Sequence, residues 1–299
     1  MSAVIVFSAD EKFIPLAKGM VLSLESHRLR ESGFELAFLN IGCGEESLDW
    51  LRRHGVAIVD PDFSLMGDLA QVATGYHISQ ASRPFLPRFF PRADCLIWLD
   101  SDVWVQLPDT VRLLASYASH HRDKLFICPE WHYSYALMNS DIVKFHVENA
   151  GFYYRAAYGP EIAAQLAVRP MLNTGVFAMA ADNPLWRMWE DEVQTLYKRD
   201  YGDQTPLMQH MAEQLALNHL ALRTGNAVSV DPLFNFLCTW TLPYRDDAGV
   251  VRVPLPPHAA VGIVHLSFWR ERRNYYLRDG LLFDQGRYLS DAERAALMW

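Results

Sequence analysis

Residues 94–106 read DCLIWLDSDVWVQ, and the rest of the chain is arranged around this stretch. Cys95 to Leu99 form a short apolar run that is typical of a strand buried on both faces inside a parallel sheet. Asp100 and Asp102 follow this run directly. Because side chains two apart on an extended chain point the same way, both carboxylates should emerge together at the carboxyl end of the strand, where open α/β sheets bind ligands.

Two carboxylates held side by side repel each other, and a hard divalent cation bound through oxygen ligands offsets that repulsion. The pair Asp100 and Asp102 therefore predicts a cation site. An alternative interpretation is that Asp100 only caps the following turn while Asp102 is solvated, because short motifs of this kind also occur without a ligand.

Apolar strand-like runs alternate with segments of helical periodicity along the first half of the chain, which predicts βαβ units. This pattern predicts an α/β fold in which helices flank a mainly parallel mixed sheet. Strands are expected at 4–7, 35–41, 56–59, 95–99, 125–128 and 171–179, and helices from 13, at 47–54, from 108, at 184–198 and from 205. Residues 79–90 read as helix broken by Pro84 and Pro87. No internal repeat or linker divides the chain, so we expect one domain over 1–299.

The composition indicates a globular protein of 299 residues with 51% hydrophobic residues, a formal charge of −8 and a pI near 5.7. General affinity for nucleic acid requires a basic face, and this chain has no such signature. Its four cysteines are scattered without C-x-x-C spacing, as in reduced core residues of a cytoplasmic protein. No signal peptide is expected, and no apolar run reaches the roughly 20 residues that span a bilayer. A peripheral membrane contact is left open.

Other polar groups lie near the ends of predicted elements. His265 stands near the end of the apolar run 261–269, and a mixed carboxylate and imidazole set favours Mn²⁺ over Ca²⁺; alone, such a histidine is also consistent with a satisfied core residue. Arginines at 270, 272, 273 and 278 suit phosphate oxygens, or form a solvated charged segment. The turn 173–175 and the pair 203–204 offer groups that could read sugar hydroxyls, although Asp203 could simply cap the next helix.

In order and spacing, these motifs resemble the family 8 glycosyltransferases. The matching segments are VIVFSAD at 4–10, Arg83, LDSD at 99–102, NTG at 173–175, DQ at 203–204, DPLFN at 231–235 and His265. The family includes bacterial lipopolysaccharide galactosyl- and glucosyltransferases and is similar to glycogenin. The resemblance covers residues 3–275 and implies a GT-A fold, a single Rossmann-like domain, followed here by a C-terminal helical extension over about 276–299.

The resemblance implies a UDP-sugar donor and a divalent ion, Mn²⁺ or Mg²⁺. Asp100, Asp102 and His265 would hold the ion against the donor diphosphate, with Ser101 between the two aspartates also at the donor site.

The other roles follow from the same resemblance. Ser8, Ala9 and Asp10 would lie beside the uracil and ribose, and Arg83 would lie near the donor sugar or phosphates. In the same comparison, Asn173 and Asp203 would hold sugar hydroxyls, Gln204 would lie beneath the anomeric carbon, and Asn235 would support the site.

One segment departs from the family pattern. The family follows its metal histidine with a Gly and a Lys-Pro-Trp that closes on the diphosphate, whereas this chain reads HLSFWRERR from His265. Arg270 or Arg272 would take the place of the lysine, although arginine and lysine are not interchangeable at such a site.

Aromatic residues are dense after the strand at 125–128, and sugars pack their C–H faces on aromatic rings. We expect an acceptor-facing wall from this segment, with candidates Trp131, Tyr133, Tyr135, Tyr153 and Tyr154.

The resulting hypothesis is a metal-dependent, retaining glycosyltransferase that moves a hexose from a UDP-sugar to a saccharide or another hydroxyl acceptor. One alternative is a metal-dependent nucleotidyltransferase, for which we would expect a Gly-rich phosphate loop after the first strand. The second is a non-catalytic carbohydrate-binding relative, which would lose the metal ligands. The segment at 8–11 is not Gly-rich, and Asp100, Asp102 and His265 are all present.

Overall fold

The computed structural model describes residues 2–67, 69, 76–132, 134–135, 140–241 and 243–267. Its strands are β1 Ala3–Ala9, β2 Phe34–Asn40, β3 Ala57–Val59, β4 Cys95–Leu99, β5 Val103–Val105, β6 Leu125–Pro129, β7 Leu172–Ala180, β8 Ala227–Ser229, β9 Phe236–Leu237, β10 Tyr244–Arg245, β11 Val251–Arg252 and β12 Ile263–His265. Its α-helices are α1 Ile14–Ser26, α2 Glu45–Arg53, α4 Tyr76–Ser82, α5 Leu86–Phe89, α6 Pro108–His120, α7 Ser140–Tyr158, α8 Pro160–Leu166, α9 Leu185–Lys198 and α10 Thr205–Thr224.

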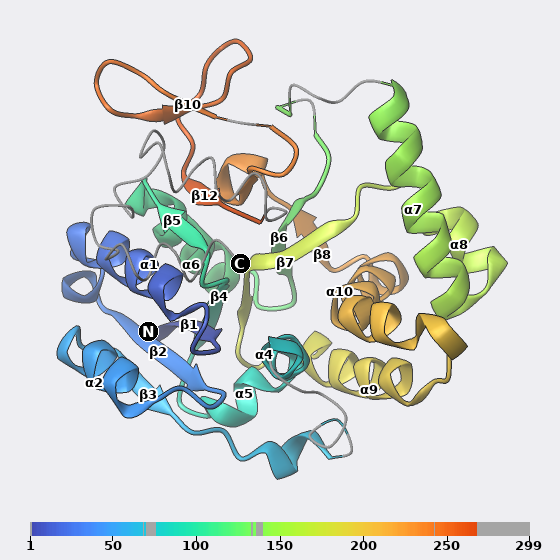
Figure 1. Ribbon diagram of the computed structural model, residues 1–299, viewed down its shortest axis with the longest axis horizontal. Helices are drawn as coiled ribbons and strands as arrows, with labels where there is room; N and C mark the ends of the chain where they lie inside the picture. Colours follow the sequence, from blue (N-terminus) through green and yellow to red (C-terminus); the bar gives the residue numbers. More distant parts are fainter. Residues whose placement is uncertain are drawn as a thin grey trace.

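A seven-stranded sheet in the order β3-β2-β1-β4-β7-β6-β8 forms the centre of the protein (Figure 1). β3, β2, β1 and β4 run parallel, and β7 alone runs against its neighbours β4 and β6. The sequence-based prediction of a mainly parallel mixed sheet in an α/β fold is confirmed.

Helices cover both faces of this sheet, and β4 shows why. Leu96 and Trp98 point into a core built with α4, α5 and α7–α10, whereas Cys95, Ile97 and Leu99 point into a second core built with α1, α2 and α6. All five side chains of β4 are buried, as expected for a central strand without a polar face.

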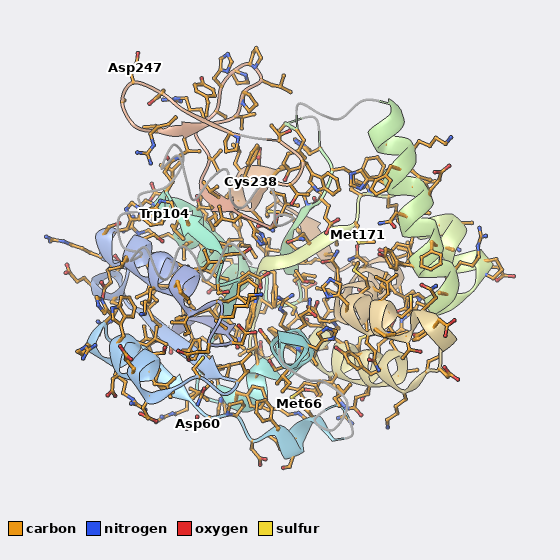
Figure 2. All side chains as sticks on the ribbon, viewed as in Figure 1. Asp60, Met66, Trp104, Met171, Cys238 and Asp247 are labelled. Atoms are coloured by element: carbon orange, nitrogen blue, oxygen red, sulfur yellow. The ribbon has the colours of Figure 1, made fainter. Side chains whose placement is uncertain are left out.

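A second sheet, in the order β5-β12-β9, stands beside the first. The chain leaves β4, turns through residues 100–102 and enters β5, so these residues join the two sheets. Behind β12 lies a third apolar cluster that includes Cys238, which is labelled in Figure 2. The β10–β11 hairpin extends away from it, with Asp247 exposed near its tip (Figure 2).

The helix breaks predicted from proline are present. α4 ends at Ser82, a 3₁₀ turn covers Arg83–Phe85, and α5 follows, because Pro84 and Pro87 cannot donate a backbone hydrogen bond within a continuous helix. This break buries Arg83 and directs it toward the end of β4.

Other predictions concern the cysteines, the membrane and the C-terminus. All four cysteines are free thiols, and three of them are buried. Among the described helices, none combines the length and apolar character needed to cross a membrane. Arg270, the other C-terminal arginines and the helical extension over 276–299 lie outside the described residues.

Candidate active site

The two aspartates at the end of β4 are anchored through the backbone. Asp100 N donates to Gly175 O on β7 at 2.8 Å, and Leu266 N donates to Asp102 O at 3.0 Å. Both side chains line a cavity of about 790 Å³ at the carboxyl end of the central sheet. The structure therefore places both carboxylates together at the end of β4, facing one cavity.

His265 joins the aspartates through strand pairing. β12 runs antiparallel to β5 with His265 opposite Val103, which brings the imidazole next to Asp102. Its Nε2 lies 3.1 Å from Asp102 Oδ1 and 3.9 Å from Asp100 Oδ2. One ligand atom from each of the three residues lies within 4.8 Å of the others, so the three residues form a cluster that could hold a metal ion.

Gly175 leaves the space that this cluster needs. A Cβ at this position would lie 2.3 Å from Cε1 of His265 and 2.9 Å from Oδ2 of Asp100. Real Cβ atoms do not approach other atoms so closely, so the imidazole and the carboxylate can converge over β7 only because residue 175 has no side chain.

A chain of amides determines which nitrogen of His265 faces the aspartates. The backbone N–H of Gly175 donates to Asn173 Oδ1, so this oxygen is an acceptor, and Asn235 Nδ2 donates to the same oxygen at 2.9 Å. The remaining amide oxygen of Asn235 must then accept, and it lies 2.8 Å from Nδ1 of His265. His265 therefore carries a proton on Nδ1 and presents Nε2 to Asp100 and Asp102.

Arg83 secures the other side of the cluster. Its NH2 donates to Asp100 Oδ1 at 2.6 Å, and its NH1 donates to Thr174 Oγ1 at 2.8 Å and lies 3.3 Å from Glu213 Oε2. Trp98 Nε1 donates to the same Asp100 oxygen at 2.7 Å. One oxygen of Asp100 is thus occupied by protein donors, and the other faces His265.

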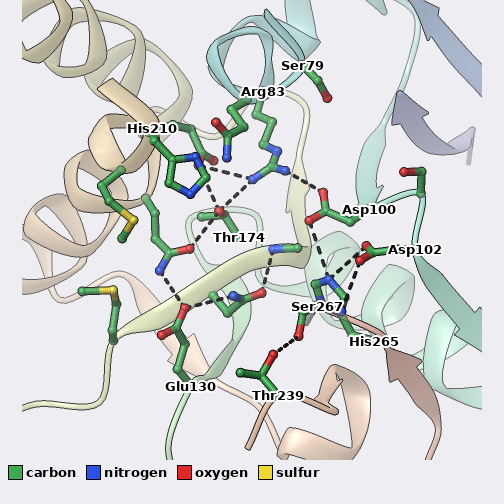
Figure 3. A pocket seen from close by; sticks show the side chains of 18 of the residues that line it. Ser79, Arg83, Asp100, Asp102, Glu130, Thr174, His210, Thr239, His265 and Ser267 are labelled. Atoms are coloured by element: carbon green, nitrogen blue, oxygen red, sulfur yellow. Dashed lines mark hydrogen bonds and ion pairs between the residues drawn. The ribbon is translucent and has the colours of Figure 1, made fainter. Parts of the chain in front are cut away.

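These contacts continue into a ring of polar side chains around the cavity floor, much of which Figure 3 shows. The fully buried Asn235 closes the ring. Beyond Thr174, Gln214 Oε1 lies 3.4 Å from Thr174 Oγ1, and Gln214 Nε2 donates to Glu130 Oε1 at 2.8 Å. Glu130 Oε1 also accepts from Asn173 Nδ2 at 3.0 Å, which leads back to His265 through Asn235. We call this set, with its aspartates, the polar ring; its members are Arg83, Asp100, Asp102, Glu130, Asn173, Thr174, Gln214, Asn235 and His265.

The polar ring and its neighbour Glu213 carry an excess of negative charge. Of the described residues that line the cavity, four are carboxylates of this group, and Arg83 is the one buried guanidinium. Burial raises the pKa of Asp100 and of Glu130, and it raises the pKa of Glu213 to about 7, in each case against nearby donors. An added cation would relieve this excess.

The donor set fits a divalent transition metal. Burial alone would lower the pKa of His265, but the charges of Asp102 and Asp100 raise it, because two carboxylates stabilise the protonated imidazole. A metal ion at this position would take the place of a proton on Nε2 and gain two carboxylates and one imidazole as ligands. The residues present therefore fit a divalent metal ion.

The cavity extends from the cluster in two directions. At one end it is lined by Ser8, Ala9 and Asp10, which follow β1 or end it, with Ser101 beside the aspartates. At the other end lie aromatic residues of separate segments, Trp131, Tyr153 and Trp240, together with His146. The rings of Trp131 and His146 stack at 6.0 Å with an interplanar angle of 6°, and His146 meets Trp240 edge to face at 4.2 Å.

The structure does not bring two of the sequence-predicted site residues to the cavity. Asp203 and Gln204 are exposed in the 3₁₀ turn before α10 and do not line the cavity. The helix that follows carries the chain inward, so its residues Glu213 and Gln214 reach the site instead. The motif match alone did not reveal this, because it does not specify the direction of α10.

Only part of the predicted aromatic wall lines the cavity. Trp131 and Tyr153 line the cavity, but Tyr135 and Tyr154 are each 1% exposed and do not line it. Each is packed in an apolar cluster, where a large ring buries most area. Tyr133 lies outside the described residues.

Sequence reasoning missed Glu130, Glu213 and Gln214. A polar residue directly after a buried strand was a usable signal for Glu130, because β6 and β4 end at the same edge of the sheet. Within α10, Glu213 and Gln214 interrupt a helix whose neighbouring residues are otherwise largely apolar. A buried glutamate next to a glutamine at that position indicates a polar partner.

Comparison with known proteins identifies the fold. No protein-family profile and no curated protein sequence matches the chain. The galactosyltransferase LgtC with donor and acceptor sugar analogs superposes with a TM-score of 0.59 at 16% identity, covering 98% of this chain and 99% of that chain. An active-site mutant of LgtC with glutamate in place of glutamine gives 0.58 at 17% identity, covering 98% and 95%. Mouse xyloside xylosyltransferase 1 gives 0.54 at 15% identity, covering 89% and 98%.

These structures agree with the architecture that the resemblance implied. These structures superpose on most of the length of this chain and have the same arrangement of elements. Their sequence identities are too low to transfer the roles of individual residues. The chain has the GT-A fold of these glycosyltransferases.

Proposed function

We propose that this protein is a metal-dependent glycosyltransferase that moves a hexose from a UDP-sugar to a hydroxyl acceptor with retention of configuration. The observation that carries the proposal is the cluster of Asp100, Asp102 and His265 at the carboxyl end of β4, inside the cavity of a GT-A fold. A carbohydrate-binding protein without catalysis would have no need of this buried, negatively charged arrangement.

The cluster would hold Mn²⁺ or Mg²⁺ through one oxygen of each aspartate and through Nε2 of His265. When bound, the ion stabilises the negative charge of the departing diphosphate. Arg83 acts through Asp100, because both of its terminal nitrogens are already engaged by Asp100, Thr174 and Glu213. It is a positioning residue that keeps the carboxylate directed at the cation site.

The nucleoside end of the donor would lie along the end of β1. Asp10 Oδ1 accepts from the backbone N–H of Phe13, which holds the carboxylate at the cavity wall. Its second oxygen can accept from a ribose hydroxyl or a base N–H. Ser8 donates to Leu39 O at 3.0 Å and retains acceptor capacity toward a ligand.

The transferred sugar would lie between the cation cluster and the aromatic end of the cavity. Asn173 is held by Glu130, Gly175 and Asn235, so its amide is fixed in the cavity wall beside the cluster. The bond between C1 and the diphosphate oxygen breaks, and a bond forms between C1 and the acceptor oxygen. The hydroxyl proton passes to the departing diphosphate, so no charge is left unbalanced.

The acceptor would pack against Trp131 and Tyr153. Sugar rings present C–H groups that suit aromatic faces, and these two residues line the cavity beyond Glu130. This arrangement favours a saccharide over a charged or extended acceptor.

Calorimetric titration of UDP-glucose, UDP-galactose and UDP-N-acetylglucosamine, with and without Mn²⁺, tests the proposal. We expect one UDP-sugar to bind in a Mn²⁺-dependent manner, with UDP released on adding acceptor saccharides. Asp102→Ala should remove both the Mn²⁺-dependent binding and the turnover while circular dichroism shows a native fold. Release of pyrophosphate from a nucleoside triphosphate and a sugar phosphate would instead identify a nucleotidyltransferase, and normal turnover of a folded Asp102→Ala variant would exclude the metal site.

A further inference from the structure

The glutamine that lies in this cavity is not the one that the sequence motif marks. Gln204 is exposed, whereas Gln214, ten residues further along α10, lines the cavity. Ten residues of α-helix span about 15 Å, so the two amides cannot serve the same ligand atom. The two glutamines also have different surroundings. Gln204 ends the 3₁₀ turn before α10, whereas Gln214 lies inside α10 next to the buried Glu213.

Gln214 is held in a defined orientation. Its Nε2 donates to Glu130 Oε1 at 2.8 Å, and its Oε1 lies 3.4 Å from Thr174 Oγ1. This leaves a second amide N–H and acceptor capacity on Oε1, because an amide group has two donors and two acceptor sites. The side chain is only partly buried, so these groups are accessible from the cavity.

Glu130 also has unused hydrogen-bonding capacity. Both hydrogen bonds that it receives from described residues, from Asn173 and Gln214, go to Oε1. Oε2 receives none within the described part of the chain, and Glu130 is only partly buried and lines the cavity. A carboxylate oxygen of this kind accepts strongly from sugar hydroxyls.

The pair lies between the cation cluster and the aromatic end of the cavity. On one side, Gln214 connects through Thr174 and Arg83 to Asp100 and the cation cluster. On the other side, Glu130 is followed by Trp131 of the aromatic end. A sugar attached to a cation-bound diphosphate and facing an acceptor on the aromatic residues must pass this point.

We propose that Gln214 and Glu130 bind the transferred sugar of the donor, in the place that the motif assigned to Asp203 and Gln204. This inference rests on the proposed function and names the sugar-binding groups of the same site. Glu213, 1% exposed, holds Arg83 and Thr174 from behind and does not contact the sugar. The LgtC mutant with glutamate for an active-site glutamine shows that a glutamine belongs to the site of one protein with this fold.

The test compares Gln214→Ala with Gln204→Ala in the full-length protein with Mn²⁺. Calorimetry measures the affinities for UDP and for the UDP-sugar that the wild type binds, and UDP release measures turnover. Gln214→Ala should bind UDP as the wild type does, lose roughly tenfold in affinity for the UDP-sugar and lose about 100-fold or more in turnover. Gln204→Ala should stay within about twofold in all three quantities, as an exposed substitution does.

Glu130→Gln provides a second variant that keeps the shape of the side chain. Glu130→Gln should lower the affinity for the UDP-sugar and leave the affinity for UDP unchanged. If circular dichroism shows that Gln214→Ala does not fold, this second variant still tests the inference. Loss of turnover in Gln204→Ala with normal turnover in Gln214→Ala and Glu130→Gln would restore the motif-based assignment and overturn this inference. If the wild type binds no UDP-sugar, the proposed function fails, and this inference fails with it.

Discussion

Nδ1 of His265 lies 2.8 Å from Oδ1 of Asn235, a residue 30 positions earlier in the chain. The distance matters because the orientation of Asn235 is set in turn by Asn173 and by the backbone N–H of Gly175. A backbone group on β7 thus determines which imidazole nitrogen faces Asp100 and Asp102. The side chains of the candidate cation site are therefore already oriented by the protein, which would lower the cost of ordering them on binding.

Asn235→Ala should weaken Mn²⁺ binding by about 10- to 100-fold, because His265 Nδ1 loses the acceptor that fixes its tautomer and ring orientation. Titration calorimetry or the electron paramagnetic resonance signal of free Mn²⁺ measures the affinity without any substrate. Asn183→Ala is a matched control: this buried asparagine bonds Lys124 O and Leu185 N, away from the cluster. Equal Mn²⁺ affinities of Asn235→Ala and the wild type would show that the amide chain has no role in metal binding.

Gly175→Ala should disturb the same cluster by steric pressure, since its Cβ would lie 2.3 Å from Cε1 of His265. We expect a loss of about 1–3 kcal/mol in the free energy of unfolding and a loss of Mn²⁺ affinity. Urea denaturation and Mn²⁺ titration measure the two effects.

The control for Gly175→Ala is Gly151→Ala. Gly151 lies inside α7, and the nearest atom to an added Cβ is Ala167 Cβ at 3.5 Å, an ordinary contact. That variant should gain roughly 0.5–1 kcal/mol from helix propensity and keep its Mn²⁺ affinity. A Gly175→Ala protein as stable as the wild type, with normal Mn²⁺ affinity, would contradict the steric argument.

Glu213 should make the stability of the metal-free protein depend on pH. Burial raises its pKa from an ordinary 4.5 to about 7, so the native state binds this proton more tightly than the unfolded state does. Its contribution to stability is then fully present below about pH 4.5 and is lost as the pH rises through 7, by a total on the order of 3 kcal/mol. Glu213→Gln, which resembles the neutral carboxyl, should reduce the fall in stability over this range.

Urea denaturation of both proteins at several pH values between about 4.5 and 8 measures this difference. Glu161→Gln, which changes an exposed glutamate on α8, serves as the control and should follow the wild type. Parallel stability curves for Glu213→Gln and the wild type would show that Glu213 keeps its charge on folding.

Trp131→Ala should weaken acceptor binding, because the ring lines the cavity beyond Glu130 and its loss removes an apolar face for the acceptor. We expect roughly a tenfold or larger loss in acceptor affinity at unchanged UDP-sugar affinity, as for other stacked aromatic contacts. Competition binding with saccharide acceptors measures it. Trp50→Ala removes a tryptophan of α2 that stacks on His54 and does not line the cavity, and it should leave acceptor affinity unchanged.

The sheet and most of its elements could be predicted from sequence because their signals are local. The apolar run at 95–99 is β4 to the residue, and the two prolines break the helix after Ser82 as expected. β7 was predicted as a strand, but its reversed direction was not, because an alternation of apolar residues carries no information on which way a strand runs.

The same difference between local and long-range signals applies to the residues of the site. Asp100 and Asp102 were predictable, since they follow the buried strand within three residues and share a side by the period of an extended chain. Asp203 and Gln204 were misplaced because the motif specifies their order and not the path of α10. Glu130 follows β6, whereas Glu213 and Gln214 lie on α10, and only the packing of α10 against β7 and the carboxyl end of β6 brings them together.

The amino-acid sequence by itself determined that this chain buries a parallel strand ending in two carboxylates, because burial and side-chain period act over a few neighbouring residues. Only the tertiary structure decided that His265 completes the pair, through the antiparallel register of β12 with β5, and that Gln214 rather than Gln204 lies in the cavity. Contacts between residues more than a hundred positions apart depend on strand order and helix direction, and these are properties of the packed chain as a whole.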